Sequence, residues 1–249
     1  MSDSDDLRMR IAQACRVLGR LDLAQGLTGH VSARIPGTNR ILIRARGPGE
    51  LGVRYTEEEQ ILEVDLDGKA TADNDLGLEV PLEVFIHTSV YKARPDVNSV
   101  VHVHPPTVVL FTICDVPILP IYGAYDPASA QLALDDIPRF DSSVLIDTPE
   151  LGGQLVQTMG EAKTCLMRGH GITTAGPSIE EASLYAIDLN ELAQMNYQAR
   201  LLGTPRPISE SDQERLRRMN RRQPGGARGD KPAGRAAAVW RYYCELTES

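Results

Sequence analysis

Hydrophobic positions recur with two different periods along this chain, and the two periods predict helices interleaved with short strands. Apolar residues spaced three or four apart mark one helical face over 5–25, whereas the apolar run at 41–43 is typical of a strand. The clearest helix is predicted over 178–202, where Ser178 is placed to cap the first turn. The same patterns predict further helices at 81–93, 107–113, 126–137 and 149–159, and strands within 26–36, 61–68, 98–104, 116–121, 142–148 and 164–176.

Strands and helices alternate as far as residue 205, which favours one α/β domain with a central sheet between helices. Several connections are short enough to be hairpins, so we expect a mixed sheet and not a purely parallel one. We place this domain at 1–207 and treat 208–249, which is rich in Arg and Gly, as a C-terminal extension.

The composition is that of a globular protein, with 42% hydrophobic and 24% charged residues among 249. No run approaches the roughly 20 consecutive apolar residues that cross a bilayer, so we expect no membrane span. The acidic start MSDSDDLRMR has no apolar core, which argues against a secretory signal. The four cysteines lie far apart and form no CxxC pair, so reduced thiols and a cytoplasmic location are expected.

The net charge of −8 argues weakly against nucleic-acid binding by the whole chain, but the charge is uneven. Residues 211–241 hold nine Lys and Arg against three acids. A mobile surface linker is the simplest interpretation of this basic tail. There are two alternatives to this interpretation. The segment could be an arm that binds RNA or a membrane, or a tail that covers an active site. The segment ends with Trp240, Tyr242 and Tyr243, which could dock the C-terminus.

Three of the five histidines have the spacing of a metal site. His102 and His104 are two residues apart on an apolar strand, so their imidazoles point to the same face. His170 lies in a Gly-His-Gly turn after another strand, where glycines let the backbone approach closely. Three imidazoles with an open position are typical of a catalytic zinc or related site. Two histidines bonded to backbone carbonyls are the structural alternative.

The chain resembles the class II aldolase/adducin family, whose enzymes include fuculose-phosphate and ribulose-phosphate aldolases and epimerases. The resemblance covers about 7–205 and combines several motifs, so it is far more specific than any one of them. The matching runs are GLTGHVSAR at 26–34, YTEEEQILEVDLDG at 55–68, PLEVFIHTSVYKARPDVNSVVHVHPP at 81–106, and LMRGHGITTAGPSIEEASLYAIDLNELAQ at 166–194.

This resemblance implies a three-layer α/β/α fold with a mixed central sheet, and a homotetramer with active sites shared between subunits. It implies His102, His104 and His170 as metal ligands, and Glu83 as the acid/base near the metal. An exposed helix carboxylate is the alternative for Glu83. A carboxylate beside a metal in a closed pocket has a tunable pKa, which suits proton transfer.

The aldolases of this family also use a tyrosine of the neighbouring subunit as a proton donor. Tyr122 in PIYGAYD is the nearest counterpart here, with Tyr125 as the second candidate. A packed core tyrosine is an equally good interpretation of Tyr122. A lid-like role for Tyr242 or Tyr243 is a weaker hypothesis.

The chain departs from the family's phosphate-binding pattern at three places. Where sugar-phosphate enzymes have Thr-Gly-Asn, this chain has Thr28, Gly29 and His30, and we expect His30 to act on the substrate, since its ring can donate to or accept from a phenol or carboxylate. Arg44 and Arg46 replace the second phosphate loop, and their planar guanidinium groups match a carboxylate. Solvated loop arginines are the alternative. The third element, before Glu83, is apolar in place of two serines, which suits a flat ring better than a polyol.

Some members of the family decarboxylate hydroxylated aromatic dicarboxylates, and these departures resemble their pockets more closely. We therefore expect a carboxy-lyase that takes an aromatic acid such as 3,4-dihydroxyphthalate in aromatic-compound degradation. An aldolase, epimerase or dehydratase acting on a sugar phosphate or hydroxy acid is the second hypothesis. A non-enzymatic scaffold like the adducin head is the third, and the intact histidines argue against it. We expect one divalent ion of Zn, Mn, Fe or Co per subunit and no organic cofactor, since no Rossmann or P-loop pattern is present.

Overall fold

The computed structural model describes residues 3–72, 75–222 and 234–248. A seven-stranded sheet runs through its centre in the order β3-β2-β1-β4-β7-β6-β5. Every neighbouring pair is antiparallel except β5 and β6, which confirms the expected mixed sheet. The strands are β1 (His30–Arg34), β2 (Arg40–Arg44), β3 (Ile61–Asp65), β4 (Ser99–Val103), β5 (Arg139–Phe140), β6 (Thr164–Met167) and β7 (Gly171–Gly176).

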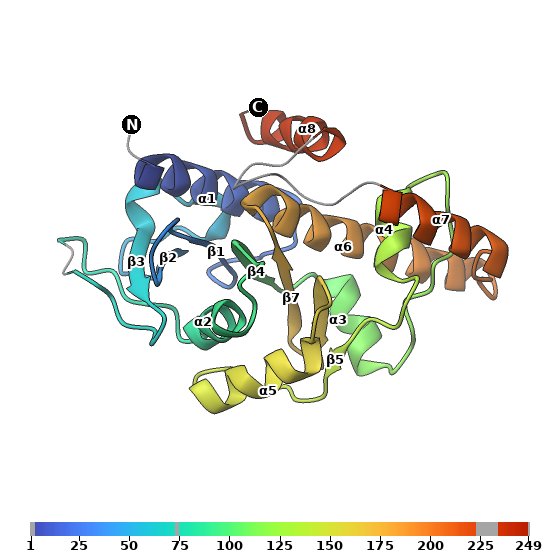
Figure 1. The fold of residues 1–249 in the computed structure, drawn as a ribbon, viewed down its shortest axis with the longest axis horizontal. Coiled ribbons are helices and arrows are strands. Elements are labelled where there is room, and N and C mark those ends of the chain that lie inside the picture. The colour runs from blue at the N-terminus through green and yellow to red at the C-terminus, as the bar shows by residue number, and fades with distance from the viewer. Residues whose placement is uncertain (1–2, 73–74, 223–233, 249) are drawn as a thin grey trace.

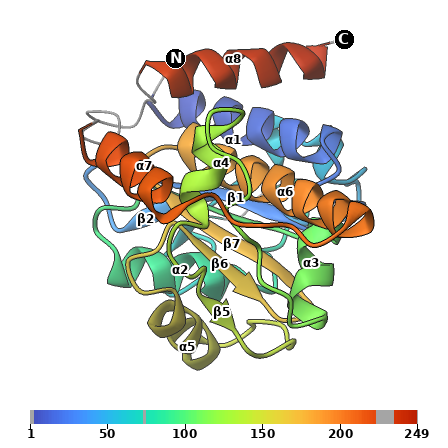
Figure 2. The same cartoon turned by 90° about the vertical axis from the view of Figure 1, so that its right-hand side faces the viewer.

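Helices cover both faces of the sheet, so the α/β/α architecture expected from the sequence is confirmed (Figure 1). Helices α1 and α6 lie on one face, and α2 and α5 lie on the other (Figure 2). The helices are α1 (Asp3–Arg20), α2 (Val84–Ala93), α3 (Pro106–Ile113), α4 (Pro127–Leu132), α5 (Pro149–Met159), α6 (Ile179–Leu202), α7 (Glu210–Arg222) and α8 (Arg235–Glu248), with 3-10 turns η1 (Val53–Tyr55) and η2 (Glu58–Gln60).

Side chains of β4 alternate between two separate apolar cores. Val101 and Val103 pack with α1, α3 and α6 in one core. Val100 belongs to the other core, with α2 and α5. His102 follows Val100 by two residues, so its imidazole points to the same face of the sheet, which is the face covered by α2.

Two predicted strands are wrong, and one short strand was missed. Residues 116–121 are irregular because Pro117 and Pro120 have no N–H for a sheet ladder. Residues 142–148 are also irregular, and the backbone N–H of Ile146 bonds to the Glu83 carboxylate instead of to a strand. Strand β5 is only two residues long, too short to leave a periodic pattern.

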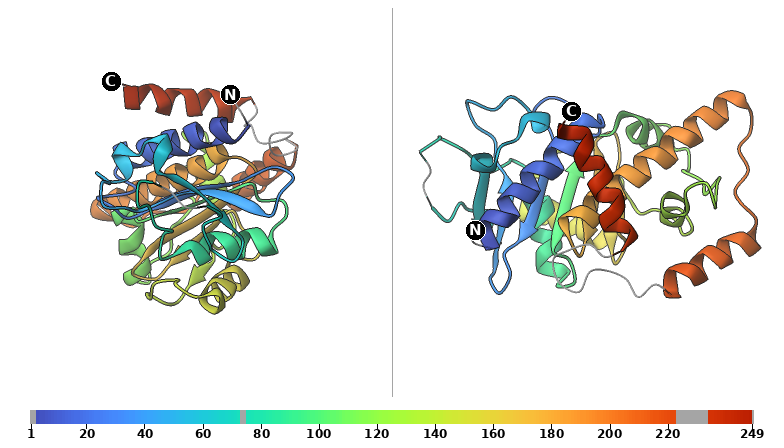
Figure 3. Two further views of the ribbon diagram at one scale, coloured as in Figure 1. Left: turned by 90° about the vertical axis from the view of Figure 1, so that its left-hand side faces the viewer. Right: turned by 90° about the horizontal axis from the view of Figure 1, so that it is seen from above.

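The C-terminal extension contains two helices where the sequence suggested a mobile linker. Helix α7 takes up the first part of the basic segment, and 223–233, with much of the Arg/Gly-rich run, lie outside the described residues. Helix α8 packs against α1 on the side of α1 that faces away from the sheet, as the left panel of Figure 3 shows. Trp240 is buried and the Tyr243 hydroxyl donates to Glu191 of α6 at 3.0 Å, so these two residues dock the C-terminus as expected, whereas Tyr242 is exposed.

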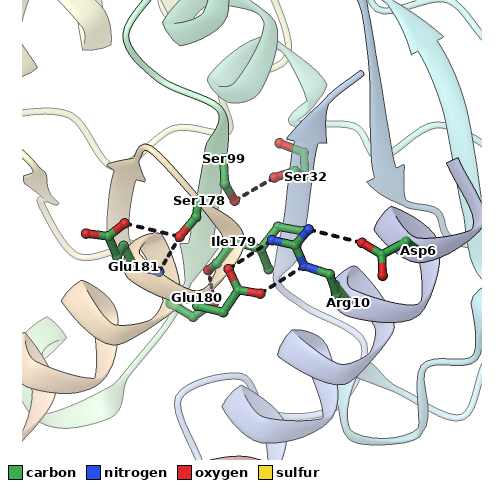
Figure 4. A network of polar contacts seen from close by, with 9 residues as sticks. Asp6, Arg10, Ser32, Ser99, Ser178, Ile179, Glu180 and Glu181 are labelled. Atoms are coloured by element: carbon green, nitrogen blue, oxygen red, sulfur yellow. Dashed lines mark hydrogen bonds and ion pairs between the residues drawn. The ribbon is translucent and has the colours of Figure 1, made fainter. Parts of the chain in front are cut away.

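A buried ion pair joins the first helix to the last long helix of the domain (Figure 4). Arg10 of α1 donates from Nε and Nη2 to the two carboxylate oxygens of Glu180 in α6, at 2.9 and 3.1 Å. The same guanidinium donates to Asp6 one turn earlier. Ser178 accepts from the Glu181 N–H at 3.2 Å, which confirms the predicted cap of α6.

In the part of the chain that the structure describes, no helix combines the length and the apolar character needed to cross a bilayer.

Candidate active site

All five histidines of the chain meet in one cluster at the end of the central strands. The antiparallel register of β1 and β4 places His30 opposite His102, and their rings stack 5.5 Å apart. His104 and His170 stack on each other and both contact His102 edge to face. His87, from α2, contacts the ring of His30 edge to face. The strand register thus assembles residues that are up to 140 positions apart in the sequence.

Three of these imidazoles and one carboxylate direct their ligand atoms at a common point. Glu83, His102, His104 and His170 each offer one atom, and these atoms all lie within 4.8 Å of one another. The Nε2 atoms of His102 and His104 are 2.9 Å apart. The two Glu83 oxygens lie 3.4 Å from His102 Nε2 and 3.3 Å from His170 Nε2. The structure therefore brings together the three expected metal ligands and Glu83, which was expected as the acid/base beside them.

Backbone groups behind this cluster fix the orientation of its members. His102 Nδ1–H donates to the carbonyl of Ile172 at 3.0 Å, which leaves the Nε2 lone pair directed at the cluster. Glu83 Oε1 accepts from the backbone N–H of Ile146 at 3.0 Å. Gly171 lets the strands close, because a Cβ there would come within 2.5 Å of the His104 ring.

The donor set fits a borderline divalent cation. Because Nδ1 of His102 is bonded to the Ile172 carbonyl, its Nε2 is the nitrogen that faces His104 Nε2, and both nitrogens could bind one cation. Imidazole nitrogens with a carboxylate are typical ligands of Zn, Mn, Fe and Co. The cluster can hold a metal of this class.

Burial controls the protonation of this cluster. Burial, reinforced by His102 and His170, lowers the pKa of His104 to about 3, so its imidazole is neutral and able to bind a metal at pH 7. Burial opposes ionisation of Glu83, but the facing imidazole of His170 and the Ile146 N–H lower its pKa below the usual range. The site therefore presents a neutral His104 and an ionised Glu83 at neutral pH.

A cavity of about 510 Å³ opens over the cluster and contains most of the residues for which a substrate contact was expected. Thr28, Gly29 and His30 form part of its wall. Burial, with the neighbouring His102 and His87, lowers the pKa of His30 well below its ordinary value, so this ring is neutral too. Further walls are apolar and come from Leu27, Leu82 and Leu145.

Arg44 lines the cavity, but its guanidinium nitrogens are hydrogen-bonded to other protein groups. Nε donates to Thr56 Oγ1 at 3.0 Å, and Nη2 pairs with Glu50 at 2.5 Å. Nη1 donates to the carbonyls of Leu27 and Gly29. The side chain is only 2% exposed, so Arg44 holds the 27–29 loop in position.

Arg46 is differently placed, at the open side of the same cavity. Its Nη2 pairs with Glu79 at 2.5 Å, and the side chain of Arg46 is partly exposed, whereas that of Glu79 is largely exposed. Its Nε is buried and has no hydrogen-bond partner among the described residues. Arg46 thus has one donor that no protein group occupies, on a residue that lines the cavity.

Tyr122 does not line this cavity. It packs near α4 and α6, and burial raises its pKa above the ordinary value for a phenol. Tyr125 is 78% exposed. Their expected role involves the site of a neighbouring subunit, which a single chain does not display.

His87 is the functional candidate that the sequence analysis missed. It follows Glu83 by four residues and precedes Tyr91 by four, and this helical spacing places all three on one side of α2. The signal was therefore present in the sequence. What the spacing could not give is the identity of the opposite strand, where Ser32 of β1 contacts both His87 and Tyr91.

The fold is that of a known class of proteins. Residues 9–197 match the model of the class II aldolase and adducin N-terminal domain, and the chain belongs to this family. It is 41% identical over 212 residues to a 3,4-dihydroxyphthalate decarboxylase from Arthrobacter keyseri, covering 84% of this chain and 85% of that protein. Another 3,4-dihydroxyphthalate decarboxylase, from Rhodococcus jostii (strain RHA1), is 36% identical over 96% of this chain and 99% of its own.

A solved structure has the same fold over the whole chain. The aldolase II superfamily protein from Pseudomonas syringae superposes with a TM-score of 0.82 at 21% identity, covering 100% of this chain and 94% of that one. The C-terminal helices thus fall within the compared region.

Proposed function

We propose that this protein is a metal-dependent decarboxylase of a hydroxylated aromatic dicarboxylate such as 3,4-dihydroxyphthalate. The observation that carries the proposal is the cavity itself, which sets the His/Glu cluster beside an arginine donor between apolar walls. The names of the two relatives support the same reaction and substrate class.

His102, His104 and His170 would hold the metal, with Glu83 beside it. The bound ion supplies Lewis-acid stabilisation of negative charge on substrate oxygens. The apolar side chains of Leu27, Leu82 and Leu145 suit the faces of an aromatic ring.

Arg46, and not Arg44, is the residue that we propose for binding a substrate carboxylate. The nitrogens of Arg44 are engaged with protein groups, whereas Arg46 Nε has no partner among the described residues. A guanidinium that holds one carboxylate fixes the ring, so that the other carboxylate is the one that leaves.

Glu83 is the residue that we propose as the proton carrier in this reaction, because it faces the cavity beside the imidazole cluster. Being ionised, it can accept the phenolic proton of the bound substrate, and the resulting carboxyl can deliver that proton to the ring carbon that bears the departing carboxylate. The bond from that carbon to the carboxylate then breaks, CO2 leaves, and the electron pair restores the aromatic ring and the phenolate. His30 lies on the cavity wall, where its ring can bond to a substrate oxygen.

We further propose a homotetramer with active sites shared between subunits, in which Tyr122 of one chain serves the site of the next. Exposed apolar side chains near the cavity support an interface there, since Leu27, Leu82 and Leu145 are each at least half exposed in the single chain. The widely spaced cysteines support work in the cytoplasm, and the substrate supports a place in aromatic-compound degradation.

The test is CO2 release from a panel of hydroxylated phthalates by protein loaded with Zn, Mn, Fe or Co. We expect one carboxyl group to leave as CO2, with 3,4-dihydroxyphthalate giving 3,4-dihydroxybenzoate. His102→Ala should lose both bound metal and turnover, whereas Tyr185→Phe, away from the cavity, should retain both. Absence of CO2 from every metal-loaded form would reject the proposal, and cleavage of a sugar phosphate by the same protein would favour the aldolase alternative.

A further inference from the structure

A buried hydrogen-bond network of three side chains connects the back of the active-site cavity with α2. The Tyr91 hydroxyl lies 2.8 Å from Ser32 Oγ, and Ser32 Oγ lies 2.7 Å from His87 Nδ1. All three residues are at most 2% exposed. The ring of His87 in turn contacts the ring of His30, with centroids 5.5 Å apart.

Two ring nitrogens at the cavity end of this network have no hydrogen-bond partner among the described residues. They are Nε2 of His87 and Nδ1 of His30, and both atoms are buried. A buried polar atom without a hydrogen bond is unfavourable, and these two belong to rings in edge contact. Because Nδ1 is the buried nitrogen of His30, Nε2 is the nitrogen directed at the cavity.

The direction of proton donation along these hydrogen bonds follows from Tyr91, the residue at their buried end. Burial raises the pKa of Tyr91, so its hydroxyl stays protonated, and Ser32 Oγ is the only side-chain acceptor that it contacts among the described residues. If Tyr91 donates to Ser32, the serine proton goes to His87 Nδ1 at 2.7 Å in preference to the Val100 carbonyl at 3.5 Å. A neutral His87 that accepts at Nδ1 carries its proton on Nε2.

We propose that His87 is a positioning residue: a small rotation of the contacting rings pairs its Nε2–H with His30 Nδ1, the two atoms that the structure leaves without a partner, and holds His30 as the tautomer with its proton on Nε2. His30 then presents an N–H donor, and not a lone pair, to a substrate oxygen in the cavity. The inference rests on the proposed decarboxylase only for the identity of that oxygen. The tautomer itself is a property of the protein before any substrate binds.

The direct test is the 15N solid-state NMR spectrum of histidine-labelled, zinc-loaded protein, which distinguishes protonated from unprotonated ring nitrogens. Only five histidines contribute, and the signals missing from His30→Asn and His87→Gln identify those two rings. We expect a protonated Nε2 and an unprotonated Nδ1 in His30. Tyr91→Phe should give both tautomers of His30. Tyr185→Phe removes a tyrosine hydroxyl that lies outside this network and should not change the spectrum. A protonated Nδ1 in wild-type His30 would overturn the inference whatever the enzyme's activity.

Kinetics tests whether His87 acts through His30. We expect His87→Leu to lower kcat by about tenfold at unchanged metal content, and His87→Gln, whose amide can donate from a similar position, to recover most of it. In a His30→Asn background, His87→Leu should cause no further loss. Additive losses would show that His87 acts independently of His30, and the inference would be rejected. If wild-type protein releases no CO2, the proposed function fails while the NMR result still decides the tautomer.

Discussion

At the scale of single residues, the structure separates side chains that the sequence could not rank. Arg44 and Arg46 are two positions apart and both line the cavity, yet one is buried among protein partners and the other retains an unused donor. The histidines divide in the same way: three of them could hold a metal with Glu83, and His30 and His87 lie beside these three. Burial and hydrogen-bond partners, and not residue type, therefore determine the expected role.

The two arginines should respond differently to the same substitution. Arg46→Gln should raise KM for the dicarboxylate about tenfold or more, because a charge-assisted hydrogen bond is worth roughly 1.5–3 kcal/mol, and it should leave stability nearly unchanged. Arg44→Gln should instead lower the free energy of unfolding by about 3 kcal/mol, since it leaves the carboxylate of Glu50, only 10% exposed, without its ion pair.

Steady-state kinetics and urea denaturation measure the two effects. Arg40→Gln is the matched control, an exposed arginine of the same strand β2 that pairs with Glu63 outside the cavity. An unchanged KM in Arg46→Gln would show that the substrate carboxylate binds elsewhere.

His87 should make stability depend on pH in a defined direction. Its folded-state pKa is lowered by burial to about 3 from 6.5, so between these values the unfolded chain binds a proton that the folded protein does not. The stability contribution is therefore fully present above about pH 6.5 and is lost as the pH falls towards 3. Metal-free wild type should lose about 1.4 kcal/mol more per pH unit than His87→Gln between pH 4.5 and 5.5.

Urea denaturation at several pH values measures this slope. Parallel curves for the two proteins would mean that His87 is protonated in the folded state, which would also contradict its assignment as a neutral donor.

At the scale of elements, long-range polar contacts fix how helices sit on the sheet. The Arg10–Glu180 pair joins α1 to α6 across the face of the sheet opposite α2. The pairing could not be predicted, because its members are 170 positions apart and each reads as an ordinary surface charge in its own helix.

Arg10→Met should lower the free energy of unfolding by about 3 kcal/mol, because it leaves the Glu180 carboxylate, which is 5% exposed, buried without its partner. The double variant Arg10→Met/Glu180→Leu should recover much of that loss, since an apolar pair carries no buried charge. Arg40→Ala, which breaks an exposed pair, should cost less than about 1 kcal/mol. Urea denaturation of the three proteins is the measurement, and equal losses in Arg10→Met and Arg40→Ala would contradict the role of burial.

At the scale of the whole molecule, the single chain leaves apolar side chains exposed around its cavity. Leu51 is 77% exposed and Leu82 is 54% exposed, both in irregular segments close to the cavity residues. Large exposed aliphatic groups gathered at one place are typical of an interface between chains.

We expect light scattering to give a mass near four times 27.3 kDa for the wild-type protein. Leu51→Asp should lower the mass and the turnover together, because a charge at the rim opposes association and the sites are proposed to be shared. Thr38→Asp places the same charge in the exposed turn at the other end of β1 and should change neither. A monomeric wild-type protein with full turnover would reject the shared site and the role of Tyr122.

Local patterns determined most of the secondary structure. Helices with clear periodicity and caps, such as α6 after Ser178, and strands in apolar runs, such as β4, were predictable because their signals lie within a few residues. The segments 116–121 and 142–148 misled the prediction because an apolar run alone does not show whether a strand partner exists.

The sequence by itself determined the residue types of the site, since the HxH pair and the Gly-His-Gly turn are local motifs whose spacing carries the chemistry. Only the tertiary structure decided which residues face one another. The register of β1 against β4 sets His30 beside His102, and the packing of α2 on that face brings Glu83 and His87 to them. These contacts join segments far apart in the chain, and no local pattern encodes a strand register or the burial that separates Arg44 from Arg46.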